Sequence, residues 1–192
     1  ARILADVVPV LPDPIVTGAF ARDLHLWHRH GIPVTRQTTD IDLAIALPDW
    51  NSFRAAREQL VASGRFTEVG QTAHRIRHAD GMMLDMVPFG GMETSTRTLE
   101  WPPDGSVRMN VLGYREARAA AHRIRLPNAI EALLVSYPSL VALKLICWRD
   151  RHLRTPRRDA QDTWVLLHSA SSCMDNARLT DALAAWSSAD DF

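Results

Sequence analysis

Two aspartates one residue apart open a segment of this chain that otherwise alternates apolar residues, RQTTDIDLAIAL at 36–47. The alternation predicts a strand over 39–47, with Ile41, Leu43 and Ile45 on one face and Asp40 and Asp42 on the other. Two carboxylates roughly 6.5 Å apart along a strand repel each other unless a cation lies between them. A hard divalent cation such as Mg²⁺ (or Mn²⁺) takes oxygen ligands and satisfies such a pair. The alternative is a solvated face of an edge strand.

A third carboxylate, Asp85, lies in an apolar segment (Met83, Leu84, Met86, Val87) where it needs a partner. The pattern predicts a hairpin with strands at 73–77 and 82–87, the second ended by Pro88, Gly90 and Gly91. If strand 82–87 lies beside strand 39–47, three carboxylates converge. That arrangement suits metal-assisted phosphoryl or nucleotidyl transfer, with Asp85 as a third metal ligand or as a base.

Residues that could bind phosphate precede the aspartates. Thr17-Gly18-Ala19 is a small-residue turn that leads into a helix over 20–30, and such a turn offers backbone N–H groups to an anion. A plain turn is the alternative reading. Arg36 and Thr38 place a cation and a hydroxyl directly before Asp40.

Lys144 belongs to a predicted helix over 138–152, where its neighbours at helical spacing are apolar. A lysine there either extends its head to water or pairs with an anion. From Lys144 to Arg158 there are six cations and one acid, and a second basic stretch holds Arg115, Arg118, Arg123 and Arg125. Such stretches can hold a triphosphate or an RNA backbone, or be solvated surface.

The remaining patterns predict a mixed α/β (α+β) fold. Ser52 is expected to cap a helix over 52–63, Thr155 a helix over 156–168, and further helices are predicted at 114–121 and 177–186. We expect an α/β domain over 1–130 and a helical C-terminal part over 131–192. The formal net charge of zero gives no global signal for nucleic acid or membrane, and no apolar run approaches a membrane span of about 18 residues. The two cysteines, Cys147 and Cys173, are expected to be reduced, which is typical of a cytoplasmic protein.

Taken together, these motifs resemble the DNA polymerase β-like nucleotidyltransferase superfamily. The similarity sharpens toward the AbiEii/AbiGii toxins of bacterial type IV toxin–antitoxin systems, the group that includes the MenT-type toxins. It rests on TGAFARDLHL, RQTTDIDLAI, LDMVPFGGME, the Trp101-Pro102-Pro103 turn, LKLICWRDR and RRDAQD.

The resemblance implies a metal-dependent enzyme that moves a nucleoside monophosphate from an NTP to an acceptor, which is the 3′ end of tRNA for MenT-type relatives. It implies Gly18 and Ala19 as the phosphate-binding turn, Asp40 and Asp42 as metal ligands, and Lys144 and Asp159 as further catalytic residues. It also implies a possible antitoxin partner. The sequence departs from the family in Gly18-Ala19, where Gly-Gly or Gly-Ser is usual, and in Arg158-Asp159, where Lys-Asp is usual.

Two other functions stay open at this point. One is transfer to a small molecule such as an aminoglycoside or lincosamide, which a pocket lined by acidic side chains would favour. The other is a degenerate fold that binds nucleotide without catalysis. A broad basic groove would favour RNA as the acceptor.

Overall fold

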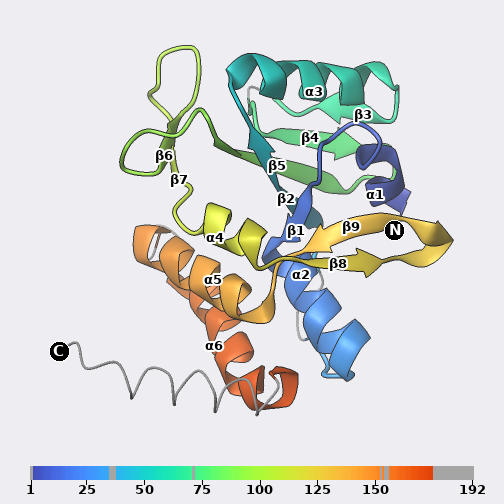
Figure 1. Cartoon of the computed structure of the whole chain (residues 1–192), viewed down its shortest axis with the longest axis vertical. Helices are drawn as coiled ribbons and strands as arrows, with labels where there is room; N and C mark the ends of the chain where they lie inside the picture. The colour runs from blue at the N-terminus through green and yellow to red at the C-terminus, as the bar shows by residue number, and fades with distance from the viewer. Residues whose placement is uncertain (1, 35–37, 71, 152, 154–155, 175–192) are drawn as a thin grey trace.

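The computed structural model describes residues 2–34, 38–70, 72–151, 153 and 156–174. The predicted helix at 177–186 and the predicted cap Thr155 lie outside these residues. The mixed α/β fold is confirmed, because helices flank a seven-stranded sheet of parallel and antiparallel pairs (Figure 1).

The sheet has the strand order β3-β4-β5-β2-β1-β9-β8. Its two parallel pairs are β2 with β5 and β1 with β9, and the other neighbours are antiparallel. The strands are β1 (Ile15–Thr17), β2 (Asp40–Leu47), β3 (Phe66–Glu68), β4 (Arg75–His78), β5 (Met83–Gly90), β8 (His122–Arg125) and β9 (Glu131–Leu134). The strand β9 lies just past residue 130 and joins the sheet between β1 and β8.

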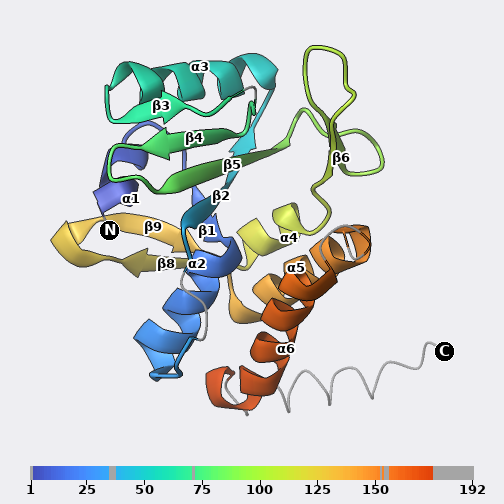
Figure 2. The same ribbon diagram turned by 180° about the vertical axis from the view of Figure 1, so that it is seen from behind.

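The helices are α1 (Arg2–Val7), α2 (Gly18–Asp23), α3 (Trp50–Ala62), α4 (Tyr114–Ala119), α5 (Tyr137–Arg151) and α6 (Pro156–Cys173). A π-helical stretch, η1 (Leu24–Arg29), continues α2, and a short 3₁₀ turn, η2 (Pro127–Ala129), joins β8 to β9. Both ribbon views place α3 beside β3 and β4 at one end of the molecule and the α5–α6 pair at the other (Figures 1 and 2). A two-stranded arm, β6 (Thr98–Glu100) with β7 (Arg108–Asn110), extends beside the sheet.

The strand β2 has the predicted apolar face and the predicted opposite face with two aspartates. Ile41, Leu43 and Ile45 are buried at 2% exposure or less, whereas Asp40 and Asp42 on the opposite face are half-buried. The apolar face packs into the main core because strand side chains alternate between the two faces of the sheet. The strand therefore presents its two carboxylates away from the core.

Two local predictions were wrong. The cap of α3 is Asp49 and not Ser52: the Asp49 side chain accepts a hydrogen bond from the Ser52 backbone N–H at 2.7 Å, and the helix begins at Trp50. The strand β5 does not stop at Pro88 but continues to Gly90, with Pro88 opposite Ile45 of β2. Proline is tolerated because, among the described residues, β4 pairs with β5 only over Met83–Asp85 and leaves the other side of β5 unpaired at Pro88.

A buried histidine connects η1 to the helical part. His25 is 2% exposed, its Nε2 donates a hydrogen bond of 2.8 Å to the Val135 carbonyl oxygen, and its ring meets the Tyr137 ring edge-on at 5.5 Å. Burial lowers the pKa of His25 below its ordinary value, and the bond to Val135 partly opposes that effect. The unfolded chain therefore binds a proton at His25 at a higher pH than the folded chain does.

Because of this difference, the stability of the protein should depend on pH. The unfolding free energy should stay constant above pH ~6.5, the ordinary histidine pKa, and should fall as the pH drops below it. Urea denaturation at several pH values between about 7.5 and 5.5 measures this slope. His25→Asn should reduce the slope, whereas His28→Asn, at an exposed position three residues on, should leave it unchanged. Equal slopes for His25→Asn and wild type would contradict the assignment.

Candidate active site

One row of residues crosses four neighbouring strands of the sheet. Thr17 of β1 is paired with Asp42 of β2, Asp42 with Asp85 of β5, and Asp85 with Arg75 of β4. Paired residues on adjacent strands project from the same face, so these side chains lie next to one another. Convergence of the carboxylates required strand 82–87 to lie beside strand 39–47, and the structure meets this condition and brings Asp42 and Asp85 together.

All four of these residues border a cleft of about 590 Å³. The sheet forms one side of the cleft, and α4, α5 and the β6–β7 arm form the rest. Where the arm meets α5, the Asn110 side-chain amide donates a hydrogen bond of 2.6 Å to Asp150. The lining residues are Thr17, Gly18, Asp42, His74, Arg75, Asp85, Val87, Thr98, Arg108, Met109, Asn110, Tyr114, Leu140, Leu143, Lys144, Cys147, Asp150 and Arg151.

Gly18 begins α2 and touches the carboxylate of Asp42. Its φ is +66°, and a Cβ at this position would lie 1.8 Å from Asp42 Oδ2. Only glycine leaves room for the carboxylate here and adopts this backbone conformation without strain. Ala19 follows with its methyl group buried at 3% exposure, so it can offer a ligand only its backbone.

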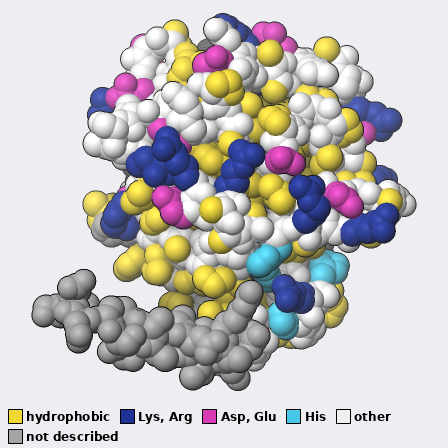
Figure 3. All heavy atoms as spheres, viewed as in Figure 1, with side chains coloured by type: hydrophobic (Ala, Val, Ile, Leu, Met, Phe, Trp, Pro, Cys, Tyr) yellow, Lys and Arg dark blue, Asp and Glu magenta, His cyan; other side chains and the backbone are white. Residues whose placement is uncertain are grey.

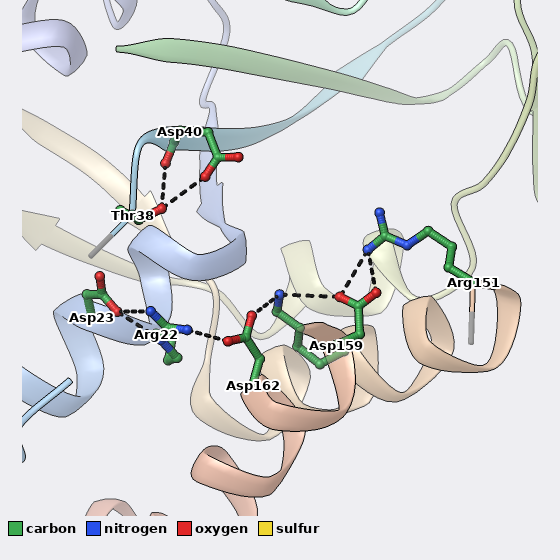
Figure 4. Close-up of polar contacts among 8 residues, drawn as sticks. Arg22, Asp23, Thr38, Asp40, Arg151, Asp159 and Asp162 are labelled. Atoms are coloured by element: carbon green, nitrogen blue, oxygen red, sulfur yellow. Dashed lines mark hydrogen bonds and ion pairs between the residues drawn. The ribbon is translucent and has the colours of Figure 1, made fainter. Parts of the chain in front are cut away.

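Asp40 lies two residues before Asp42 on the same strand face, and Thr38 holds it. The Thr38 hydroxyl is 3.0 Å from Asp40 Oδ1 and 3.1 Å from the Asp40 backbone carbonyl (Figure 4). Thr38, expected to bind nucleotide, therefore orients the first aspartate. Arg36, predicted beside it, lies outside the described residues.

Asp85 has a partner that the sequence reading missed. Arg75 donates from Nε to one oxygen at 2.6 Å and from Nη2 to the other at 2.5 Å, which is a bidentate pair on a buried aspartate. The hydrogen bonds that Arg75 donates to Asp85, and the nearby charges of Asp85, Asp40 and Asp42, raise the pKa of Arg75, while burial opposes them. The guanidinium therefore lies in the combined field of all three carboxylates.

The Lys144 head group pairs with anions and does not extend to water. Its side chain is 12% exposed, and its Nζ lies 2.8 Å from Asp162 and 3.8 Å from Asp159, both on α6. Asp162 also pairs with Arg22 of α2, which in turn contacts Asp23 at 2.6 Å. Figure 4 shows this chain of charges running from α2 across α6 toward α5.

Asp159 completes the chain at the other end. It is 3% exposed and accepts from Arg151 of α5 at 3.1 Å, so it supports two cations, Lys144 and Arg151, that line the cleft. It does not itself line the cleft among the described residues. The side chain of Arg158, predicted as a nucleotide contact, lies outside the described part of the structure.

Sequence signals existed for some of the residues that were missed. Asp162 follows Asp159 by three residues in RRDAQD, so both occupy one face of a helix. Arg75 lies within the predicted hairpin, but the predicted strand ends would place it opposite Leu84, whereas the observed register places it opposite Asp85. Arg22 pairs with Asp162 across 140 positions, and no local pattern indicates such a contact.

Two further groups in the cleft are uncharged at neutral pH. Burial raises the pKa of the Tyr114 hydroxyl well above its ordinary value, and burial likewise raises the pKa of the Cys147 thiol. Burial lowers the pKa of His74, although the charge of Asp85 opposes that shift. The charged side chains of the cleft are therefore its arginines, Lys144 and its aspartates.

The donor set fits a metal held by two carboxylates. Within the described residues, no group of three or more His, Cys, Asp or Glu side chains is arranged to hold an ion by itself. Mg²⁺ typically takes one or two protein carboxylates and completes its shell with substrate phosphates and water. Asp40 and Asp42 can provide the protein's share of such a shell.

A mixed sheet with an Asp-x-Asp strand beside a glycine turn, facing cations on a helical part, defines a nucleotidyltransferase. Residues 2–191 match the family described as nucleotidyl transferase AbiEii toxin, type IV TA system, and the chain belongs to that family. It is a nucleotidyltransferase enzyme, with an NTP as one substrate and an acceptor as the other. No curated protein sequence matches it.

Two solved structures of one antibiotic-resistance factor agree on the fold, and a third structure matches with a lower TM-score. The solution structure of the antibiotic-resistance factor ANT(2″)-Ia has a TM-score of 0.50 and 18% identity, covering 97% of this chain and 94% of that one. The crystal structure of ANT(2″)-Ia with adenylyl-2″-tobramycin has a TM-score of 0.50 and 16% identity, covering 97% and 96%. The lincosamide adenylyltransferase LnuA with bound lincomycin has a TM-score of 0.44 and 14% identity, covering 80% and 84%. In the part of the chain that the structure describes, no helix is long and apolar enough to cross a membrane.

Proposed function

We propose that this enzyme transfers a nucleoside monophosphate from an NTP to the 3′ end of a tRNA, as the toxin of a type IV toxin–antitoxin pair with its own antitoxin. The observation that supports an RNA acceptor is the charge of the cleft. Its lining holds four cations, Arg75, Arg108, Lys144 and Arg151, and three acids, Asp42, Asp85 and Asp150. Asp85 pairs with Arg75 and Asp150 with Arg149. The other three cations of the lining pair with carboxylates outside it, which are Glu100, Asp162 and Asp159.

The proposed reaction asks mainly for positioning and charge neutralisation. The acceptor hydroxyl forms a bond to the α-phosphorus, the bond from that phosphorus to the bridging oxygen of pyrophosphate breaks, and the hydroxyl proton is released. A divalent ion held by Asp40 and Asp42 would offset the negative charge of the phosphates. Asp85 borders the same space, but Arg75 engages it, so the proposal places the ion on Asp40 and Asp42.

Lys144 and Arg151 are the cations proposed to bind the triphosphate. Both line the cleft, and Asp159 and Asp162 hold them in place from behind. A lysine and an arginine fixed by buried carboxylates lose little freedom when a phosphate binds. Gly18 lets the backbone at the start of α2 approach the same ligand.

The outer surface agrees with a polyanionic acceptor. Lys and Arg side chains form a band across the middle of the face on which α4, β8 and β9 lie, with acidic side chains between them (Figure 3). Arg115 and Arg118 of α4 and Arg123 of β8 have side chains that are 54%, 40% and 60% exposed, and each lies within 4.0 Å of a carboxylate. Exposed arginines of this kind can contact a nucleic-acid backbone without reading its sequence.

The experiment that tests the proposal follows a radioactive label. The protein is incubated with each α-labelled NTP and Mg²⁺, with total RNA in one set of reactions and an aminoglycoside or lincosamide in another. We expect label on RNA of tRNA size with one preferred NTP, and none after EDTA removes the metal. Label on the antibiotic alone would replace the tRNA proposal with antibiotic modification. NTP binding without transfer to any acceptor would identify a nucleotide-binding module.

A further inference from the structure

The β6–β7 arm turns a polar face toward the cleft. Thr98 is paired with Asn110 and Glu100 with Arg108, so these four side chains project from one face of the two strands. Three of them, Thr98, Arg108 and Asn110, line the cleft. The arm therefore presents hydroxyl, amide and guanidinium groups on a different side of the cleft from the sheet, which carries the aspartates.

The arm is attached to the rest of the molecule at two points. Trp101, directly after β6, packs against Trp50 and Phe53 of α3, with ring centroids 4.9 and 5.4 Å apart. At the end of β7, Asn110 donates its hydrogen bond of 2.6 Å to Asp150 of α5. Both ribbon views show the arm on the side of the molecule between α3 and α5 (Figures 1 and 2). A surface that is held in place before binding loses little freedom when a ligand arrives.

Arg108 differs from the other cations of the lining in the partner that it has. Its Nη2 lies 2.9 Å from Glu100 across the arm, and the two side chains are 71% and 45% exposed. Lys144 and Arg151 pair instead with carboxylates of α6 that are only 4% exposed. An exposed ion pair contributes little stability. Arg108 can therefore exchange Glu100 for a phosphate at small cost, whereas the other two cations are held by buried partners.

We propose that the polar face of the arm binds the acceptor, and that Arg108 contacts a phosphate of its RNA backbone. The inference rests on the proposed function and adds to it the surface that receives the RNA. Of the four cations in the lining, Arg75 holds Asp85, and Lys144 and Arg151 bind the triphosphate in the proposed function. Arg108 remains for the second polyanion. A contact to phosphate positions the acceptor without reading its bases.

Binding of bulk tRNA, labelled at its 5′ end and followed by fluorescence anisotropy without NTP, tests the inference without any turnover. Arg108→Met should bind tRNA about tenfold more weakly, because one charge-assisted hydrogen bond to phosphate is lost. The slope of log affinity against log salt concentration should become shallower by about one. Calorimetry should give the same NTP affinity for Arg108→Met and the wild type. Arg54→Met is the matched control that should bind tRNA like the wild type, since it removes the same charge from an exposed position on α3.

Glu100→Gln separates binding of RNA from a purely structural role of the ion pair. It releases Arg108 and removes a negative charge from the same face, so it should bind tRNA about threefold more tightly. If the pair only supported the arm, both variants would bind more weakly. Binding by Glu100→Gln that is no tighter than that of the wild type would overturn the inference, and this outcome does not depend on the folding of Arg108→Met. So would equal tRNA affinities for Arg108→Met and Arg54→Met.

The proposed function and this inference fail separately. Label transfer to RNA by the wild type decides the former, whatever the variants bind. A wild type that labels RNA and binds tRNA no better than Arg108→Met does overturns only the inference. Label on an antibiotic alone, with no tRNA bound by the wild type, overturns the proposed function and the inference with it.

Discussion

An Asp42→Asn variant is expected to fold normally and to lose nucleotide transfer by about three orders of magnitude, since stabilisation of transition-state charge by a metal contributes several kcal/mol. Asp42 is the aspartate of the Asp-x-Asp pair that lines the cleft, and it lies between Gly18 and Asp85. The amide keeps the shape of the side chain but removes the negative charge that attracts the ion. Initial rates of label transfer, with melting temperatures measured in parallel, test the expectation.

The control for Asp42→Asn is Glu58→Gln, which removes one negative charge from an exposed position on α3. It should transfer label at the wild-type rate, because surface charges away from a site have small effects. Retention of a tenth or more of the wild-type rate by Asp42→Asn would remove Asp42 from the catalytic role. A fall in melting temperature matching the fall in rate would assign the loss to folding.

The strand that presents Asp42 was predictable because it is long and its alternation is strict. Eight residues of β2 follow one pattern, and a pattern of that length determines which residues face the core. Strands β1, β6 and β7 have three residues each, and β8 and β9 have four. At such lengths alternation cannot be distinguished from chance, so their pairing depends on contacts between distant segments that the local sequence does not encode.

The residues of the candidate site also differ in whether local sequence patterns identify them. Asp40, Asp42 and Gly18 could be found because they belong to one strand and one turn with recognisable local patterns. Asp85 could be placed beside Asp42 only on the condition that the two strands pair, which the structure confirms. The contact between Arg22 and Asp162 could not be found, because it joins α2 to α6 and exists only once the helical part has packed on the sheet.

Those distant contacts change how Lys144 is understood. From the sequence it is a lysine on an apolar stripe, whereas in the structure it is the middle cation of a chain that links Arg22, Asp162 and Asp159. Because Arg22 lies four residues after Gly18 on the same helical segment, this chain of ion pairs connects Lys144 in the cleft with the glycine turn. A buried network of this kind holds its members in one geometry when every member is satisfied.

Gly18→Ala is the second variant expected to have a large effect, and it acts through Asp42. The new methyl carbon would lie 1.8 Å from Asp42 Oδ2, a separation that no pair of unbonded atoms tolerates, so the carboxylate or the start of α2 must move. A shift of about 1 Å at a reacting centre costs roughly a hundredfold in rate. We therefore expect label transfer to fall by about that factor, with weaker Mn²⁺ binding by the nucleotide-free protein.

Gly31→Ala separates the steric effect from backbone strain. Gly31 has a φ of +67°, against +66° for Gly18, but a Cβ there would meet nothing within 4 Å. Both substitutions place alanine in the left-handed region and cost about 1–2 kcal/mol of stability for that reason. Only Gly18→Ala should lose transfer, and equal activity in the two variants would show that contact between Gly18 and Asp42 has no part in catalysis. The comparison therefore isolates the contact between Gly18 and Asp42. It tests whether Asp42 can take part in transfer only when residue 18 has no side chain.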